Sequence, residues 1–297
     1  MDSHLETAGP VLDLPVADLL DGQPAFGSPH DFRRALELGA FLARIPTAVD
    51  VGPGLTFCKS YFLPRTDSGD RYRGHRNQGH SLSKLGYEDR PDQVEQLQLE
   101  NHTWPEYLPQ DVLVTLAAMR RLTISILNAT LDHVGAAVDD RRAITGADRA
   151  DGASWCHTTM NHYRTALAGR PGIFEHKDSG FITLIYSDGP GLEIFHDGEW
   201  KRAEYRSDCF TVNYGASLGV LTENLPNPVT AVLHRVPEID PHGPQHDRSS
   251  FTVYLGPDYD SDLLTYAPDG GLVPFANFRD FSLEQARKQR YEFHARL

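Results

Sequence analysis

The sequence predicts one mainly β domain with flanking helices. Between residues 155 and 260, short apolar and β-branched segments alternate with turn residues, a pattern typical of strands in a sheet. Before them, residues 110–134 place apolar side chains at steps of three and four, which predicts one long helix with an apolar stripe. At about 1.5 Å per residue this helix would be roughly 40 Å long, enough to brace the whole sheet.

Length and charge limit the possible organisation and partners. The chain has 297 residues and a formal net charge of −13. β-rich domains often reach this length undivided, so we expect a single domain over 1–297. We divide it into an N-terminal region 1–109, the long helix 110–134, a core 155–260 and a C-terminal segment 261–297. The negative charge argues against nucleic acid and anionic membrane surfaces as partners, and no obligate protein partner is evident.

The sequence also indicates a cytoplasmic location. No apolar run approaches the roughly 20 residues needed to span a bilayer, and residues 1–6 lack a basic and then apolar export signal. The three cysteines, Cys58, Cys156 and Cys209, have no metal-type spacing. We therefore expect free thiols in a reducing compartment.

The N-terminal region opens with several short elements. Residues 11–14 read as a strand, and residues 30–38 as an amphipathic helix that Ser28 caps and Gly39 ends. Residues 40–45 then return as a strand.

Residues 64–109 are polar and have no sustained period, so we expect a loop that covers a substrate, or disorder. Within them, Arg71, Arg73 and Arg76 concentrate positive charge in an acidic protein. Three guanidinium groups could hold a substrate carboxylate or phosphate. The alternative is a solvated loop.

The remaining connections look irregular. Residues 139–152 are charged and read as a surface connector, and residues 257–274, rich in Asp, Gly and Pro, read as a loop. Ser282 can cap a final helix over 283–296.

A possible metal site lies in the core. In an extended strand, His176 and Asp178 point to the same side and Lys177 faces away. A third ligand, His234, lies in an apolar run, 230–236, that reads as a buried strand. Two imidazoles and one carboxylate leave other metal positions open, as in non-heme Fe(II) oxygenases. Zinc is less expected, because a closed structural zinc site needs four protein ligands.

An anion clamp follows the third ligand. Arg248 and Ser250 alternate along a strand-like run, so the guanidinium and the hydroxyl share a face. A rigid charged fork with a hydroxyl suits the far carboxylate of a dicarboxylic acid. A lone His-X-Asp or Arg-X-Ser pair is usually a surface feature. The ordered set is different: it indicates a 2-oxo acid that chelates iron.

These motifs resemble the iron- and 2-oxoglutarate-dependent dioxygenases of the isopenicillin N synthase-like superfamily, over roughly residues 155–260. Segments 181–185, 191–195 and 212–215 are similar to that family's core. The resemblance implies a double-stranded β-helix, or jelly-roll, core braced by the long helix.

Within the family, Gly215-Ala216 and the long gap from His234 to Arg248 resemble bacterial deacetoxycephalosporin C synthase-type enzymes, which expand the cephalosporin ring. Those enzymes carry arginines where this chain has Thr159 and Asn161. A β-lactam substrate is therefore not expected.

The resemblance also implies the roles of individual residues. Fe(II) is expected on His176, Asp178 and His234, with 2-oxoglutarate and O2 as cosubstrates. Contacts to 2-oxoglutarate are expected from Arg248, Ser250, Tyr163, Asn161 and Thr183. Contacts to the substrate are expected from Arg71, Arg73, Arg76, Ile173, Phe174, Phe195 and Thr159. By alternation Thr159, Asn161 and Tyr163 share one strand face, and His162 takes the other.

The implied activity is oxidation of an unactivated C–H bond in a small, carboxylated natural-product intermediate, by hydroxylation, desaturation or ring formation or expansion. Secondary-metabolite or antibiotic biosynthesis is the expected setting. Two alternatives stay open. An oxidase of the same fold needs no 2-oxoglutarate and could keep the Arg-X-Ser pair for a substrate carboxylate. A non-catalytic jelly-roll binding protein is the other, and the complete triad argues against it.

Overall fold

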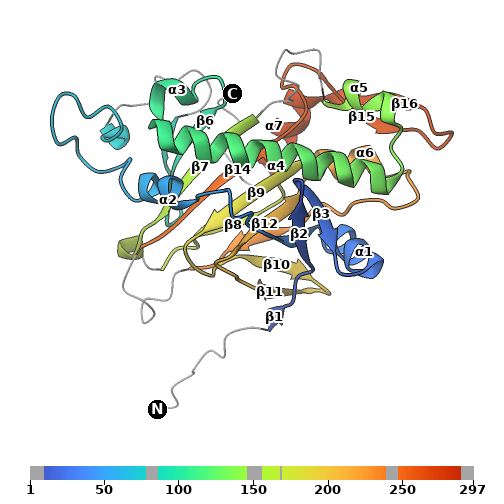
Figure 1. Cartoon of the computed structure of the whole chain (residues 1–297), viewed down its shortest axis with the longest axis horizontal. Coiled ribbons are helices and arrows are strands. Elements are labelled where there is room, and N and C mark those ends of the chain that lie inside the picture. The colour runs from blue at the N-terminus through green and yellow to red at the C-terminus, as the bar shows by residue number, and fades with distance from the viewer. Residues whose placement is uncertain (1–9, 78–85, 146–155, 168, 239–246, 289–297) are drawn as a thin grey trace.

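Two β-sheets form the body of the protein (Figure 1). The computed structural model describes residues 10–77, 86–145, 156–167, 169–238 and 247–288. A nine-stranded sheet has the order β3-β2-β4-β12-β9-β14-β7-β6-β5, and a five-stranded sheet the order β1-β11-β10-β13-β8. A separate hairpin pairs β15 with β16. The mainly β fold with flanking helices and a jelly-roll core is confirmed.

The strands are short and mostly antiparallel. The large sheet consists of β2 (Val16–Leu20), β3 (Gln23–Phe26), β4 (Ala40–Arg44), β5 (Tyr87–Asp89), β6 (Val94–Glu100), β7 (Cys156–Tyr163), β9 (Ile182–Ser187), β12 (Cys209–Tyr214) and β14 (Arg248–Leu255). The small sheet consists of β1 (Val11–Leu12), β8 (Ile173–His176), β10 (Glu193–His196), β11 (Glu199–Ala203) and β13 (His234–Val236).

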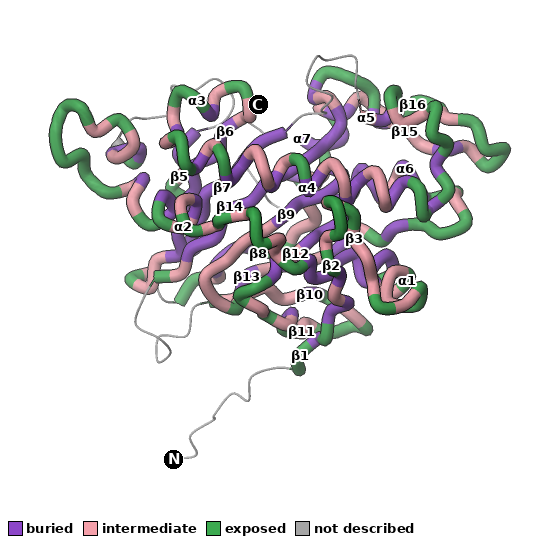
Figure 2. Tube along the Cα trace, in the orientation of Figure 1, coloured by how far each residue is buried: buried purple, intermediate pink, exposed green. Residues whose placement is uncertain are grey.

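The centre of the large sheet is its most buried part (Figure 2). Strand β14 pairs with β7 on one side and with β9 on the other, and β6 extends the sheet beyond β7. β-Branched and aromatic residues dominate β14, which suits a strand covered on both faces. One face packs against a helix, and the other faces the small sheet.

The long predicted helix is α4 (Gln110–Val134), with the predicted bounds. It lies along the large sheet and contacts α2 (Gly52–Cys58), β3, β9 and β14 (Figure 1). By length and composition alone, α4 is long and apolar enough to cross a membrane, contrary to the prediction that no apolar run approaches the required length. Its apolar residues, among them Leu116, Met119 and Ile126, are buried, as expected for a core helix of a globular domain.

The predicted helix of the N-terminal region is confirmed, whereas β2, β3 and α2 were not predicted. Helix α1 (Pro29–Leu38) begins after Ser28, whose Oγ accepts a 3.2 Å hydrogen bond from the backbone N–H of Asp31. It ends at Gly39, whose φ of 77° is in the left-handed region that glycine adopts without a Cβ clash. The three cysteines are free and buried.

The prediction of an unstructured segment over 64–109 was wrong. It contains β5, β6 and the short helix α3 (Trp104–Tyr107). Polar side chains conceal β6 in the sequence, because both faces of this strand hold hydrogen-bonded polar groups. Gln96 and Gln98 lie on one face and Glu95 on the other, and all three are buried.

The C-terminal prediction is also corrected. Residues expected to form a loop fold into the hairpin of β15 (Asp262–Tyr266) and β16 (Leu272–Asn277). Helix α7 (Phe278–Lys288) begins four residues before Ser282, so Ser282 is a buried residue inside the helix and not its cap. The predicted helix beyond Lys288 lies outside the described residues. The described residues also form α5 (Arg141–Thr145), α6 (Ala216–Thr222) and the 3-10 helices η1 (His75–Asn77), η2 (Val138–Asp140) and η3 (Thr165–Leu167).

Candidate metal and cosubstrate site

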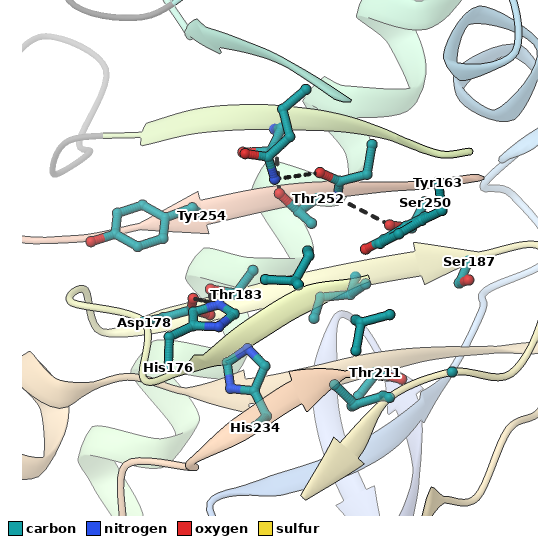
Figure 3. A pocket seen from close by; sticks show the side chains of 18 of the residues that line it. Tyr163, His176, Asp178, Thr183, Ser187, Thr211, His234, Ser250, Thr252 and Tyr254 are labelled. Carbon is teal, nitrogen blue, oxygen red and sulfur yellow. Dashed lines mark hydrogen bonds and ion pairs between the residues drawn. The ribbon is translucent and has the colours of Figure 1, made fainter. Parts of the chain in front are cut away.

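The three predicted metal ligands meet between the two sheets (Figure 3). His176 ends β8 and His234 begins β13, and the two residues are direct partners in the pairing of these strands. Asp178 lies in the turn after β8. One ligand atom from each residue lies within 4.8 Å of the other two. The sequence therefore identified a set of side chains that the fold does bring together.

The local reason differs from the predicted one. Strand β8 ends at His176, so a turn, and not alternation along a strand, brings Asp178 beside it. The backbone N–H of Ala216 donates a 2.7 Å hydrogen bond to the carbonyl of Asp178 and holds this turn. Lys177 also borders the cavity and does not simply face away.

Backbone carbonyls fix the orientation of both imidazoles. Nδ1 of His176 lies 2.8 Å from the carbonyl oxygen of Phe174, and Nδ1 of His234 lies 3.2 Å from that of Val232. A carbonyl only accepts, so each Nδ1 carries the proton and each Nε2 presents a lone pair. Metal-binding histidines commonly have such a partner behind the ring.

Thr183 orients the carboxylate. Its hydroxyl donates a 2.6 Å hydrogen bond to Oδ2 of Asp178, which leaves Oδ1 to face the two imidazoles. Burial alone would raise the pKa of Asp178, but the neighbouring His234 and His176 and this hydrogen bond lower it below its usual value. Burial, together with His234, lowers the pKa of His176. The site thus offers a carboxylate and two imidazole nitrogens as donors, which fits a divalent ion such as Fe(II).

The predicted anion clamp opens into the same cavity. Arg248 and Ser250 project from one face of β14, as predicted, and Tyr163 lies opposite Arg248 on β7. The guanidinium carbon of Arg248 lies 4.1 Å from the ring centroid of Tyr163, and its Nη1 donates a 2.8 Å hydrogen bond to the carbonyl of Pro190. Ser250 Oγ accepts a 3.0 Å hydrogen bond from Nδ2 of Asn161.

The metal ligands and the clamp therefore share one cavity of about 170 Å³. Ile173, Thr159 and Thr183 also line it. On β7, the face that carries Thr159, Asn161 and Tyr163 points into the cavity. His162 lies on the other face, where it binds Glu95 and Asp247.

Two aromatic predictions are corrected. Phe174 and Phe195 do not line the cavity, and 46% and 42% of their surfaces are exposed. In β8, Ile173 and His176 line the cavity, while Phe174 and Glu175 between them are exposed. Phe195 contacts Trp200 instead, with ring centroids 5.3 Å apart.

The three arginines also lie outside the cavity lining. Arg71 donates to the carbonyl of Pro105, and Arg73 pairs with Asp70. Arg76 binds Glu95 through two hydrogen bonds on the face of β6 that points away from the cavity. These contacts correct the prediction that the three guanidinium groups hold the substrate.

Several residues of the lining were missed by the sequence analysis. Tyr254 continues the face of Arg248 and Ser250 along β14, and its ring stacks on His157 at 4.2 Å. Strand alternation could have found Tyr254. Gln96 and Gln98 come from the strand that was not predicted. Ser282 and Gln285 come from α7 in the C-terminal segment.

Comparisons with known proteins agree with this site. Residues 155–257 match the 2OG-Fe(II) oxygenase superfamily. This segment contains all three metal ligands and every lining residue of the cavity except those of β6 and α7. This segment, about a third of the chain, is therefore similar to 2OG-Fe(II) oxygenases.

Curated relatives that the chain matches include plant proteins. The chain is 33% identical over 128 residues to 2-oxoglutarate-dependent dioxygenase 19 of Oryza sativa subsp. japonica, which covers 40% of this chain and 35% of the relative. It is 25% identical over 140 residues to gibberellin 2-beta-dioxygenase 8 of Arabidopsis thaliana, covering 46% of this chain and 38% of the relative. The matched segments span only about a third of the length of these relatives.

Solved structures share the fold over nearly the whole chain. JOX2 in complex with 2OG, Fe and JA superposes with a TM-score of 0.67 at 17% identity, covering 94% of this chain and 86% of that one. Neurospora crassa T7H in complex with alpha-KG and thymine gives a TM-score of 0.68 at 15% identity, with 93% and 97% coverage. The jelly-roll fold is thus common to all three proteins.

Proposed function

We propose that this protein is an Fe(II)- and 2-oxoglutarate-dependent oxygenase that oxidises an unactivated C–H bond of a small molecule. One observation carries the proposal. A single cavity holds two imidazoles and a carboxylate at one end and an arginine with a serine at the other. The first set suits Fe(II), and the second suits the far carboxylate of a dicarboxylic acid.

Each group has a defined part in binding. His176, Asp178 and His234 would hold Fe(II), while Arg248, Ser250 and Tyr163 would hold the 5-carboxylate of 2-oxoglutarate. Iron, 2-oxoglutarate and O2 together supply the oxidising power, and 2-oxoglutarate leaves as succinate and carbon dioxide. The protein orients the reactants and limits the entry of water, since the cavity lies between two sheets with α7 at its rim.

We also propose a class of substrate. We infer a small natural-product intermediate, in keeping with the cavity volume of about 170 Å³. Proteins of this fold bind JA or thymine, both small molecules. With the three arginines outside the lining, Lys177 is the side chain beside the metal ligands that would meet a substrate carboxylate. Hydroxylation, desaturation and ring chemistry all fall within the proposal, because each begins at the same kind of C–H bond.

The test is an anaerobic titration of 2-oxoglutarate into the Fe(II)-loaded protein. Bidentate chelation of iron by a 2-oxo acid gives a weak visible metal-to-ligand charge-transfer band. We expect this band in the wild type and its loss in His176→Ala. Iron bound without a band would refute the use of 2-oxoglutarate and favour the oxidase alternative. Absence of iron binding would refute the metal site itself.

A further inference from the structure

A row of polar side chains crosses the large sheet and ends at the anion clamp. Gln96 on β6 is the register partner of Asn161 on β7, and Asn161 is the register partner of Ser250 on β14. All three side chains therefore project from the same face, and all three line the cavity. They are 4%, 5% and 4% exposed, so each hydrogen bond between them is buried.

Hydrogen bonds join the row from end to end. Nε2 of Gln96 donates to Oδ1 of Asn161 at 2.7 Å, and Nδ2 of Asn161 donates to Oγ of Ser250 at 3.0 Å. The order of donors and acceptors matters, because an amide can present either its oxygen or its nitrogen to a neighbour. The orientation of each amide, with its oxygen or its nitrogen toward a given neighbour, must therefore be fixed by another group.

Arg90 fixes the orientation of the Gln96 amide. Its Nη1 donates to Oε1 of Gln96 at 3.4 Å, and Nε2 of Gln98 donates to the same oxygen at 3.3 Å. A guanidinium has no acceptor, so the atom of Gln96 that faces Arg90 must be the oxygen. Arg90 is itself held by Asp92, with hydrogen bonds of 2.9, 3.0 and 3.1 Å, and both residues are buried.

The orientation of Gln96 then fixes the donor and acceptor of each following hydrogen bond. With its oxygen turned to Arg90, Gln96 can only donate to Asn161. Asn161 therefore accepts through Oδ1 and donates through Nδ2, and Ser250 must accept from it. The hydroxyl proton of Ser250 finds no acceptor among the described residues, so it can be directed into the cavity.

We propose that Arg90 and Gln96 are positioning residues that, through Asn161, make the Ser250 hydroxyl a hydrogen-bond donor toward the distal carboxylate of a bound 2-oxo acid. This inference rests on the proposed function and adds two residues of β6 and its preceding loop to the clamp. An anion needs donors, and a serine hydroxyl that was required to donate to Asn161 would turn its lone pairs toward the anion. The row prevents that arrangement.

The test reverses the donor–acceptor order of these hydrogen bonds by replacing a single atom. In Gln96→Glu, the nitrogen that faces Asn161 becomes an oxygen, while the contact with Arg90 is kept. Asn161 must then donate to the new carboxylate and turn its Oδ1 to Ser250, which has to donate to it. We expect the Kd of 2-oxoglutarate for the Fe(II) protein, measured anaerobically by calorimetry, to rise about tenfold, or about 1.4 kcal/mol.

Two comparisons separate reversal of the row from the effect of a new negative charge. First, Gln96→Glu is introduced into Ser250→Ala, where no hydroxyl remains to be turned, and the further rise in Kd should fall below about twofold. Second, 2-oxopentanoate is titrated, because it has the same chain length without the distal carboxylate. Its Kd should be the same for wild type and Gln96→Glu.

The outcomes are distinguishable. Wild-type protein that does not bind 2-oxoglutarate would refute the proposed function. Wild-type binding with an unchanged Kd in Gln96→Glu would refute the row alone. A tenfold loss that persists in the Ser250→Ala background would also refute it, since the new charge would then act directly. Gln96→Met, which only interrupts the row, serves as a second variant if Gln96→Glu fails to fold, and we expect it to raise the Kd about threefold.

Discussion

The hydroxyl of Thr183 donates a 2.6 Å hydrogen bond to Oδ2 of Asp178 and so decides which carboxylate oxygen faces the two imidazoles. The two residues come from different sheets. Thr183 lies in β9 of the large sheet, and Asp178 lies in the turn that follows β8 of the small sheet. The large sheet thus orients a ligand that the small sheet supplies.

We therefore expect Thr183→Val to weaken metal binding. The variant keeps the shape of the side chain but leaves the carboxylate without its donor, and loss of such a partner commonly costs about 10-fold to 100-fold in affinity. Competition of Fe(II) binding against a chelator would measure this change. Thr183→Ser, which keeps the hydroxyl, should bind Fe(II) within about threefold of the wild type. Equal affinities for all three proteins would contradict this role of Thr183.

The absence of a side chain at Gly191 leaves the space that the Arg248 guanidinium occupies. Its φ is 149°, and a Cβ added there would overlap Nη1 of Arg248. We expect Gly191→Ala to displace the guanidinium and to raise the Kd of 2-oxoglutarate about tenfold, with Fe(II) affinity unchanged. The calorimetric titration of the Fe(II) protein measures both affinities.

Gly198→Ala is the matched control for Gly191→Ala. Gly198 also has a positive φ, 81°, but nothing lies within 4 Å of a Cβ built there. It therefore shares the backbone strain without the contact to Arg248. If Gly198→Ala weakened 2-oxoglutarate binding as much as Gly191→Ala, strain and not displacement of Arg248 would be the cause.

Glu95 is a buried carboxylate that anchors the segment containing Arg76 to the back of the sheet. Burial raises its pKa, but hydrogen bonds from His162, Arg76 and Tyr87 outweigh burial and hold the pKa at about 2. The pKa is lower in the folded protein than in the unfolded chain, where a glutamate titrates near 4.3. The ionised form thus contributes stability above about pH 4.5, and this contribution is lost as the pH falls toward 2.

We expect Glu95→Gln to lower the free energy of unfolding by about 3 kcal/mol at pH 7, because it removes the charge that the surrounding donors pair with. Urea unfolding at a series of pH values would measure this. The difference between wild type and variant should shrink as the pH falls from 4.5 toward 2. Glu100→Gln is on the same strand, and its carboxylate pairs with the exposed His102; we expect it to change stability much less than Glu95→Gln, by about 0.5 kcal/mol. A difference for Glu95→Gln that does not vary with pH would contradict the pairing of its charge.

The helices with clear periodicity and caps could be predicted from the sequence. Helix α4 has its predicted bounds, and the helix capped by Ser28 and ended by Gly39 is present. These elements depend on interactions within a few residues, which a local pattern records. Strand β6 was missed because its polar residues mimic a loop, and it becomes β-structure by pairing with the distant β7. The hairpin of β15 and β16 was missed because the Asp, Gly and Pro residues in and around it mimic a loop.

The sequence by itself determined the chemistry of the site: two imidazoles, one carboxylate, and an arginine with a serine on one strand face. Their types and order suffice for that inference, because metal and anion chemistry depends on which groups are present. Only the tertiary structure decided which other residues share the cavity. It placed Arg71, Arg73 and Arg76 outside the lining, and it brought Gln96 into register with Asn161 and Ser250. Register between strands far apart in the chain depends on the packing of whole sheets, and no local pattern records it.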